Sequence, residues 1–210
     1  MKIQELEITK IVKRTGDPQE ILQQAGWQVL GYGVDGAVAK HPKKPYVLKL
    51  FVSKSAYVPF VHYVQTHQSN PHLPKFDRYV RKVPGTDLSY VRMEKLKPIP
   101  NEGFDLAKTH AGEILSLYSI AEDHNLADEL DYYWLIDELG LRALPKSQNL
   151  DKFYQEEGIE PPESSWVQAI SDLINISQSQ HVGWDLHLEN MMLRGNTLVI
   201  IDPFYLPVIS

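Results

Sequence analysis

The feature that most constrains this chain is a spaced set of polar residues near its end. Asp185 and Asn190 lie five positions apart, and Asp202 follows the apolar stretch at residues 198–201. The spacing predicts a loop that carries Asp185 and Asn190, and then a strand that brings Asp202 beside it. Carboxylate and amide oxygens are ligands that suit Mg²⁺. One acid of such a set could accept a proton while the amide and the other acid hold the metal.

Each of these three residues also has an ordinary structural explanation. Asp185 could be a turn residue, Asn190 could cap a helix, and Asp202 could be an acid that ends a strand before a proline. For any one residue alone the structural explanation is favoured. Their order, together with the motifs upstream, favours the functional one.

A glycine motif lies near the start of the chain. The pattern G-x-G-x-x-G-x-V comprises Gly31, Gly33, Gly36 and Val38. A turn without side chains lets backbone N–H groups approach phosphates closely. A dinucleotide-binding fold uses similar glycines but needs a helix directly after them. Small and β-branched residues follow Gly36 and lead to a proline turn, so the motif predicts a β-hairpin.

Lys49 lies in the next apolar segment, where it alternates with Val47 and Phe51. Such a lysine is commonly a solvent-facing strand residue. On the strand after a glycine hairpin, however, it is also placed to contact nucleotide phosphates. The glycine turn, the lysine, the Asp–Asn loop and the second aspartate together indicate phosphoryl transfer from a magnesium-bound nucleotide.

In these motifs the chain resembles the protein-kinase-like superfamily, which includes protein kinases and the aminoglycoside and fructosamine phosphotransferases. The resemblance covers about residues 27–206. It implies an α+β fold in two lobes: an antiparallel-sheet N-lobe at residues 1–96 and a reduced helical C-lobe at 97–210. Residues 97–101, with two prolines, are expected to link them without regular structure.

The resemblance also implies the cofactors ATP and Mg²⁺ and a role for each motif residue. Asp185 resembles the catalytic acid–base and Lys49 the ligand of the α- and β-phosphates, so both are expected to be catalytic. Asn190 and Asp202 resemble the metal ligands. The positions expected to bind the nucleotide are Gly31, Gly33, Gly36, Val38, Lys49, Met93, Glu94 and Leu96, of which Met93 is the gatekeeper and the last two belong to the adenine-reading hinge.

Local patterns predict the secondary structure in the same order. The expected helices are 17–25, 55–68, 105–121, 126–140 and 163–180. The expected strands are 27–30, 37–40, 46–51, 78–83 and 89–94, with a short arm at 3–13 and a loop with a short helix at 145–162.

Some positions depart from the family pattern. The H-R-D motif appears as Gly183-Trp184-Asp185, and the D-F-G motif as Asp202-Pro203-Phe204. The lysine that follows the catalytic acid in Ser/Thr kinases is His187, as in many small-molecule phosphotransferases. The last two departures favour the small-molecule branch of the superfamily.

Another departure concerns the helix at 55–68, which contains no Asp or Glu. In the family an acid from this helix orients the strand lysine. We expect Gln65, or an acid from elsewhere in the N-terminal half, to approach Lys49 when nucleotide is bound.

The function predicted from these residues is transfer of the γ-phosphoryl group of ATP to a hydroxyl, with Ser or Thr of a protein as the expected acceptor. The protein acceptor rests on the glycine–valine motif and on residues 70–76, which resemble protein kinases. A cut-down kinase of this kind would fit an effector or a toxin. A small-molecule phosphotransferase and a pseudokinase that only binds its partners stay open as alternatives.

Composition limits the setting. A net charge of −6 and a pI of about 5.7 argue against a nucleic-acid partner, which usually calls for a basic face. The chain contains no cysteine, so thiolate metal sites are excluded. Residues 1–7 are charged where a signal peptide needs an apolar run. We therefore expect a cytoplasmic protein with no membrane partner; delivery into another cell and the oligomeric state stay open.

Overall fold

The chain is described by a computed structural model at residues 18–33, 36–83, 86–100, 109–124 and 146–206. It divides into two compact units. The first takes the described residues up to Gln68, together with Pro74–Leu96 and the residues from Tyr205 onward. The second takes Ser69–Leu73 and the described residues of Lys97–Phe204.

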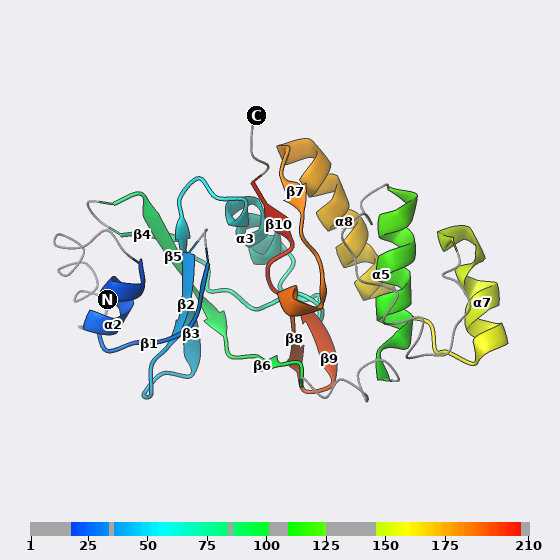
Figure 1. Cartoon of the computed structure of the whole chain (residues 1–210), viewed down its shortest axis with the longest axis horizontal. Coiled ribbons are helices and arrows are strands. Elements are labelled where there is room, and N and C mark those ends of the chain that lie inside the picture. Colours follow the sequence, from blue (N-terminus) through cyan, green and yellow to red (C-terminus); the bar gives the residue numbers. More distant parts are fainter. Residues whose placement is uncertain (1–17, 34–35, 84–85, 101–108, 125–145, 207–210) are drawn as a thin grey trace. The chain divides into compact units, whose positions relative to one another are not determined.

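The first unit is built on a five-stranded antiparallel sheet with the order β1-β2-β3-β5-β4. Figure 1 shows these strands between two helices of the same unit, α2 and α3. The strands are β1 (Gln28–Gly33), β2 (Gly36–Lys40), β3 (Tyr46–Val52), β4 (Arg81–Lys82) and β5 (Leu88–Glu94). The predicted strand at 78–83 is shortened to two residues, because Arg78 and Tyr79 are exposed and outside the sheet.

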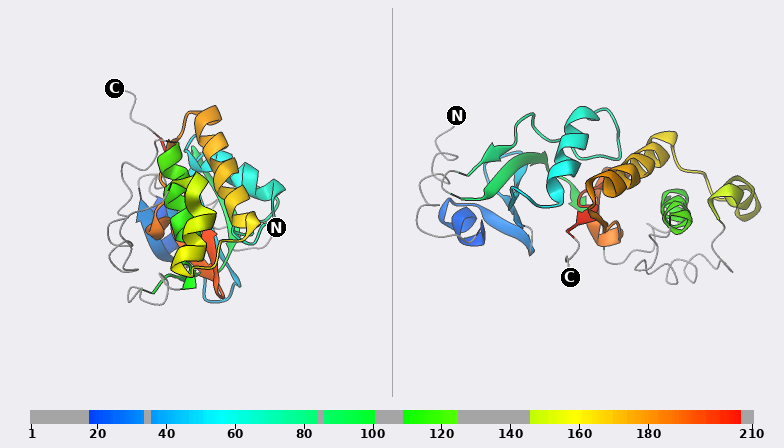
Figure 2. Two further views of the ribbon diagram at one scale, coloured as in Figure 1. Left: turned by 90° about the vertical axis from the view of Figure 1, so that its right-hand side faces the viewer. Right: turned by 90° about the horizontal axis from the view of Figure 1, so that it is seen from above.

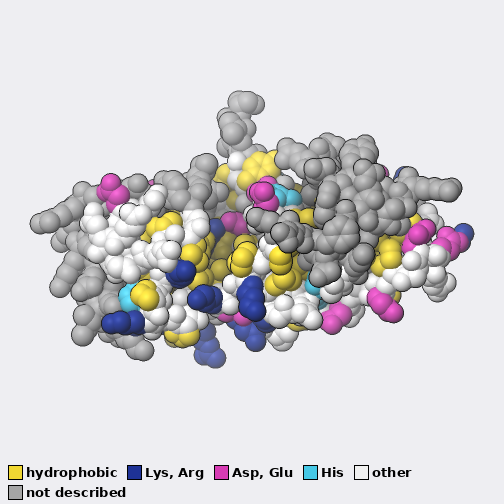
Figure 3. All heavy atoms as spheres, turned by 60° about the horizontal axis from the view of Figure 1, so that its bottom comes forward, with side chains coloured by type: hydrophobic (Ala, Val, Ile, Leu, Met, Phe, Trp, Pro, Cys, Tyr) yellow, Lys and Arg dark blue, Asp and Glu magenta, His cyan; other side chains and the backbone are white. Residues whose placement is uncertain are grey.

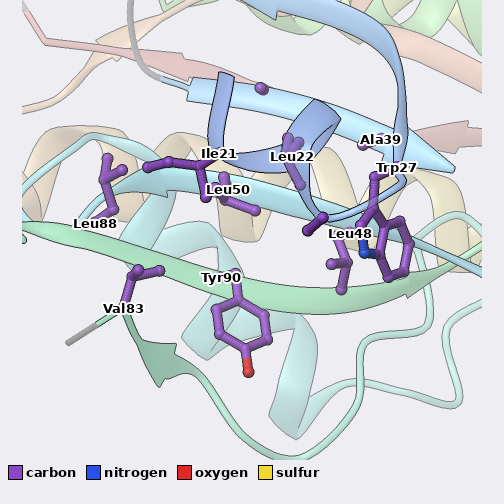
Figure 4. Packing of buried hydrophobic residues seen from close by; sticks show 11 residues of the cluster. Ile21, Leu22, Trp27, Ala39, Leu48, Leu50, Val83, Leu88 and Tyr90 are labelled. Carbon is purple, nitrogen blue, oxygen red and sulfur yellow. The ribbon is translucent and has the colours of Figure 1, made fainter. Parts of the chain in front are cut away.

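Helix α2 (Pro18–Gln24) supplies the core on one face of this sheet. Proline at its first position suits a helix start, where the missing N–H costs nothing. Ile21 and Leu22 are fully buried and pack over Leu48 and Leu50 of β3 (Figure 4). Because side chains alternate along a strand, Lys49 and Phe51 point to the opposite face.

Helix α3 (Tyr57–Thr66) belongs to that opposite face and buries aromatic side chains. Phe60 lies 6.0 Å from Phe76, ring centre to ring centre, and Tyr57 lies 5.3 Å from Phe51. Pro59 is the third residue of the helix, where it interrupts no intrahelical hydrogen bond. The helix is therefore held to the sheet by aromatic packing.

The second unit is mainly helical. Its helices are α5 (Ala111–Asp123), α7 (Leu150–Glu157) and α8 (Ser164–Gln180), with short 3₁₀ turns η1 (Ser147–Asn149) and η2 (Leu188–Asn190). Two small sheets complete it: β6 (Lys97–Pro98), β8 (Met191–Arg194) and β9 (Thr197–Ile200) form one, and β7 (Gly183–Trp184) pairs with β10 (Phe204–Tyr205). A sheet-rich first part and a helical second part confirm the predicted α+β fold class.

The predicted irregular linker at 97–101 is partly wrong. Lys97 and Pro98 form strand β6, which pairs antiparallel with Leu193 and Met192 of β8. Proline is tolerated there because β6 is an edge strand of only two residues. The predicted helix at 126–140 and the arm at 3–13 lie outside the described residues.

Helices α5 and α8, green and orange in Figure 2, pack against each other. Trp166 of α8 is fully buried in this packing. The indole Nε1 of Trp166 donates to the carbonyl oxygen of Glu113, at 3.0 Å, and to Oγ of Ser116, at 2.9 Å. On the first turn of α5, a Cβ added to Gly112 would lie 2.2 Å from the carbonyl oxygen of Glu160. The chain before α8 therefore lies directly on α5, and only glycine permits that approach.

The polar surface of α7 contrasts with this packing. Glu156 and Glu157 are exposed, and Lys152 lies 3.4 Å from the Glu156 carboxylate. Figure 3 shows acidic side chains on the surface around α7. These acids form solvated surface. No helix in the described part of the chain is long and apolar enough to cross a membrane.

Residues 69–73 come from the N-terminal half of the sequence but are built into the second unit. Arg194 donates to the carbonyl oxygens of Pro71 and Leu73, at 2.6 and 2.8 Å. The side-chain amide of Asn70 donates to the carbonyl oxygen of Ser165, and His72 Nδ1 to that of Leu198. Side-chain hydrogen bonds of Asn70, His72 and Arg194 thus hold residues 69–73 in the second unit.

His72 is buried at the centre of this segment and should make the unit sensitive to acid. Burial lowers the pKa of His72 below its ordinary 6.5, and the nearby charge of His110 lowers this pKa further. The hydrogen bond to Leu198 and the charges of Glu113 and Glu163 raise the pKa but do not offset the effect of burial. The folded chain therefore binds this proton more weakly than the unfolded chain. Neutral His72 therefore stabilises the folded chain above about pH 6.5, and this contribution is lost as the pH falls toward the folded-state pKa of His72.

We accordingly expect the free energy of unfolding to fall between about pH 7 and about pH 5, and to fall less in a His72→Asn variant. Asparagine can still donate to the Leu198 carbonyl but does not titrate. Denaturant unfolding of both proteins across this range measures the difference. Equal pH dependence in the two proteins would show that His72 is not the group responsible.

Candidate functional site

The glycine motif forms the hairpin of β1 and β2. Gly31 lies opposite Val38, and Gly33 lies opposite Gly36. Residues 34 and 35, at the tip, lie outside the described part. A strand rather than a helix follows Gly36, which removes the dinucleotide-binding alternative, because that fold places a helix N-terminus at the phosphates.

Gly36 is required for backbone reasons. Its φ is +154°, and a Cβ at this position would lie 1.9 Å from the carbonyl oxygen of Leu50 on the neighbouring strand. Gly31 differs, since an added Cβ there meets nothing within 4 Å. The backbone therefore requires glycine at position 36 but not at position 31.

This difference gives a stability prediction with a matched control. Gly36→Ala should lower the free energy of unfolding by about 3 kcal/mol or more, since both the φ value and the close approach to Leu50 must be relieved. Gly31→Ala should change it by less than about 1 kcal/mol. Thermal or denaturant unfolding of both variants measures this. Equal losses would mean that the hairpin does not pack as described.

Lys49 lies in the middle of β3. It pairs with Val38 of β2 and with Val91 of β5, so the structure places two predicted nucleotide-binding residues side by side on adjacent strands. The lysine is half-buried. Its Nζ lies 4.5 Å from the ring centre of Tyr57, the first residue of α3.

Gln65, expected to approach Lys49 when nucleotide is bound, makes another contact in this structure. Its side-chain amide donates to the carbonyl oxygen of Asp77 at 3.0 Å. The carboxylate of Asp77 accepts from Arg81 at 2.6 Å and lies 3.9 Å from Arg92. Gln65 is thus part of the network that joins α3 to the segment before β4.

The predicted adenine-binding hinge begins at the end of β5, the strand that pairs with the lysine strand β3 on the side opposite β2. Met93 is buried opposite Val47, and Leu96 is buried beyond the strand. The backbone N–H of Glu94 donates to the carbonyl oxygen of Lys75, and its carboxylate accepts from the Lys75 N–H at 2.7 Å. Glu94 therefore holds the strand end in place through both its backbone and its side chain.

In the second unit the Asp185–Asn190 loop is closed by its own side chains. The Asn190 amide nitrogen donates to the Asp185 carbonyl oxygen at 2.6 Å and to its carboxylate at 3.1 Å. The 3₁₀ turn η2 creates this approach by shortening the path between the two residues. Both side chains are only half-buried, which leaves the site accessible to a ligand.

The same loop is tied to the backbone on both sides of Asp202. The N–H of Asp185 donates to the carbonyl oxygen of Pro203 at 2.8 Å, and the N–H of Ile201 donates to that of Asn190 at 2.9 Å. The residues before and after Asp202 are therefore each bonded to one end of the loop. These two bonds hold the backbone around Asp202 beside the loop that carries Asp185 and Asn190.

His187 is part of the same group. Its Nε2 lies 3.5 Å from the Asp185 carboxylate and 3.1 Å from the Asn190 amide nitrogen. A charged imidazole there would pair with Asp185, whereas a neutral one could accept from Asn190. His187 thus contacts the predicted acid–base directly.

The donor set fits a magnesium ion in chemical type. The carboxylate of Asp202 and the amide oxygen of Asn190 are hard oxygen ligands, and Mg²⁺ commonly takes one or two carboxylates from the protein and its remaining ligands from water and phosphate. Within the described residues, no group of three or more His, Cys, Asp or Glu side chains is placed to hold a metal.

Tyr57 is not among the site residues predicted from the sequence, because an aromatic residue at the start of an apolar helix is typical of core. The only signal was its position, eight residues after Lys49 and directly after the turn that follows β3.

No protein-family model and no curated protein matches the chain. Among solved structures, the ternary complex of APH(2″)-IIa with streptomycin and ATP is similar over 86% of this chain and 67% of its own, with a TM-score of 0.30 and 16% sequence identity. The fold class rests on the elements of the chain itself: an antiparallel sheet with a glycine hairpin and a lysine strand, followed by a mainly helical unit.

Proposed function

We propose that this chain is a kinase-like phosphotransferase that uses Mg·ATP to phosphorylate a hydroxyl group. The observation that carries the proposal is the pair of backbone hydrogen bonds that tie the Asp185–Asn190 loop to the residues flanking Asp202. They support a shared task for three polar side chains that lie apart in sequence. A structural role for each residue separately would not require this convergence.

The roles follow from the chemistry of each group. Asp185 would accept the proton of the attacking hydroxyl, while Asn190 and Asp202 would hold Mg²⁺. When bound, the ion would neutralise the negative charge of the phosphates. Lys49 and the hairpin N–H groups would bind the phosphates, with Gly31, Gly33, Gly36 and Val38 shaping the approach. Met93, Glu94 and Leu96 would form the adenine-binding segment.

For the acceptor, the contacts of His187 favour a small-molecule hydroxyl. Ser/Thr kinases carry a lysine at this position, and a lysine offers a flexible charge that can meet the transferred phosphate. Here an imidazole contacts both Asp185 and Asn190. A protein Ser or Thr acceptor, supported by the glycine–valine motif and residues 70–76, remains the second candidate.

The test is incubation of the purified chain with Mg²⁺, γ-labelled ATP and a cell lysate separated by size into macromolecules and small molecules. We expect label to pass to an acceptor in the small-molecule fraction. Transfer only to the macromolecular fraction would favour the protein acceptor. Binding of Mg·ATP without transfer to either fraction would contradict the proposal and support a nucleotide-binding pseudokinase.

A further inference from the structure

An aromatic ring at the start of α3 lies close to the Lys49 ammonium. Nζ of Lys49 lies 4.5 Å from the ring centre of Tyr57. Cations within about 6 Å of an aromatic ring centre, over its face, are attracted by the ring quadrupole. We propose that Tyr57 is a positioning residue that holds Lys49 for the phosphates of ATP, in the role that an acid on this helix has in related kinases. The inference rests on the proposed function.

The ring is suited to this because it is itself immobilised. Tyr57 is only 3% exposed. Its ring centre lies 5.3 Å from that of Phe51, 5.5 Å from that of Phe60 and 6.2 Å from that of Phe76. Strand β3, helix α3 and the segment before β4 each contribute a ring, so Tyr57 has little freedom to turn away. A fixed partner reduces the rotamers that the lysine can sample.

The backbone sets the position of Tyr57 relative to Lys49. Strand β3 ends at Val52, and α3 begins at Tyr57 after a turn of four residues. Ser53 pins this turn: its N–H donates to the Asp87 carbonyl oxygen at 2.7 Å, and its hydroxyl lies 2.7 Å from that of Ser89. The lysine strand and the start of α3 are therefore joined by a short connection held to the sheet.

An aromatic partner also has a chemical consequence. A carboxylate neutralises the lysine with which it pairs, whereas a ring attracts the ammonium and leaves its full positive charge. The contact with Tyr57 would thus orient Lys49 without itself neutralising the ammonium. The attraction is weaker than that of a buried ion pair, so its loss should reduce ATP affinity without abolishing it.

The test is a double-mutant cycle between Lys49→Met and Tyr57→Leu, read by calorimetric binding of Mg·ATP and of adenosine. We expect Tyr57→Leu to weaken Mg·ATP binding about tenfold and to leave adenosine binding unchanged. Tyr57→Phe, which keeps the ring, should bind as the wild type does. In the Lys49→Met background Tyr57→Leu should have no further effect. Tyr63→Leu, which removes another ring from α3, is the matched control and should bind normally.

Three results would overturn the inference: unchanged Mg·ATP affinity in Tyr57→Leu, an equal loss for adenosine, or a loss that persists in the Lys49→Met background. An unchanged affinity in Lys49→Met would instead contradict the proposed function. Should Tyr57→Leu fail to fold, the wild-type protein still gives an answer by NMR. The Lys49 ε-methylene protons, assigned from Lys49→Met, should be shifted upfield by the ring, and an ordinary lysine shift would contradict the contact.

Discussion

Asp202→Ala is expected to reduce phosphoryl transfer to background, roughly a thousandfold or more, and to weaken Mg·ATP binding while the protein stays folded. In the proposed site this carboxylate is the principal negative ligand of the magnesium, whose neutralisation of phosphate charge contributes several kcal/mol to transition-state stabilisation. The fold should tolerate the change, because Asp202 is half-exposed and the hydrogen bonds beside it are made by the backbone of Ile201 and Pro203. Transfer rate and Mg·ATP affinity of the purified variant measure the effect.

Glu189→Gln is the matched control for this prediction. Glu189 lies in η2, next to Asn190, and its side chain is exposed. The substitution removes the same charge from the same region of the second unit. Transfer by Glu189→Gln should be close to wild type, and an equal loss in both variants would mean that general charge, rather than metal binding by Asp202, decides activity.

Asp185→Asn should leave nucleotide affinity nearly unchanged and lower turnover by about two orders of magnitude or more. A positioned general base contributes about that much, and an amide cannot accept the hydroxyl proton. The substitution is conservative for structure, because its side-chain oxygen can still accept from the Asn190 amide, as Asp185 does at 3.1 Å. Steady-state turnover together with direct measurement of Mg·ATP binding separates the two effects.

The contrary outcome for Asp185 is equally specific. If nucleotide affinity falls as far as turnover, Asp185 acts as a metal ligand or supports the loop. His187 offers a check on this point, since it contacts the same carboxylate. A His187→Gln variant that retains wild-type nucleotide affinity would show that the loop tolerates local change.

The elements with strong local patterns were predictable from the sequence. The hairpin followed from the small and β-branched residues after Gly36 and the proline turn beyond them. Lys49 lies at the centre of the next strand, as its alternation with Val47 and Phe51 indicates. Helix α8 followed from its apolar spacing and begins within a residue of the predicted position. In these segments local preference and the final packing agree.

Other features depend on contacts between distant residues. Pro98 reads locally as a linker, yet it lies in β6 because β8, far along the sequence, offers a partner strand. The motif spacing indicated that Asp185, Asn190 and Asp202 belong together, but not the backbone bonds of Ile201 and Pro203 that join them. The contact of Tyr57 with Lys49 depends on how α3 packs, which no pattern in the sequence specifies.

Phosphoryl transfer from Mg·ATP by this chain can be measured directly with labelled ATP. The purified wild-type chain is supplied with lysate as a source of acceptors, and the rate at which it removes the γ-phosphoryl group is compared with Mg²⁺ present and with the metal chelated. We expect loss of the γ-phosphoryl group that requires Mg²⁺, exceeds a blank without the chain, and is absent from Asp202→Ala. A rate that Asp202→Ala and wild type share, or no rate above the blank at saturating Mg·ATP, would contradict the proposal.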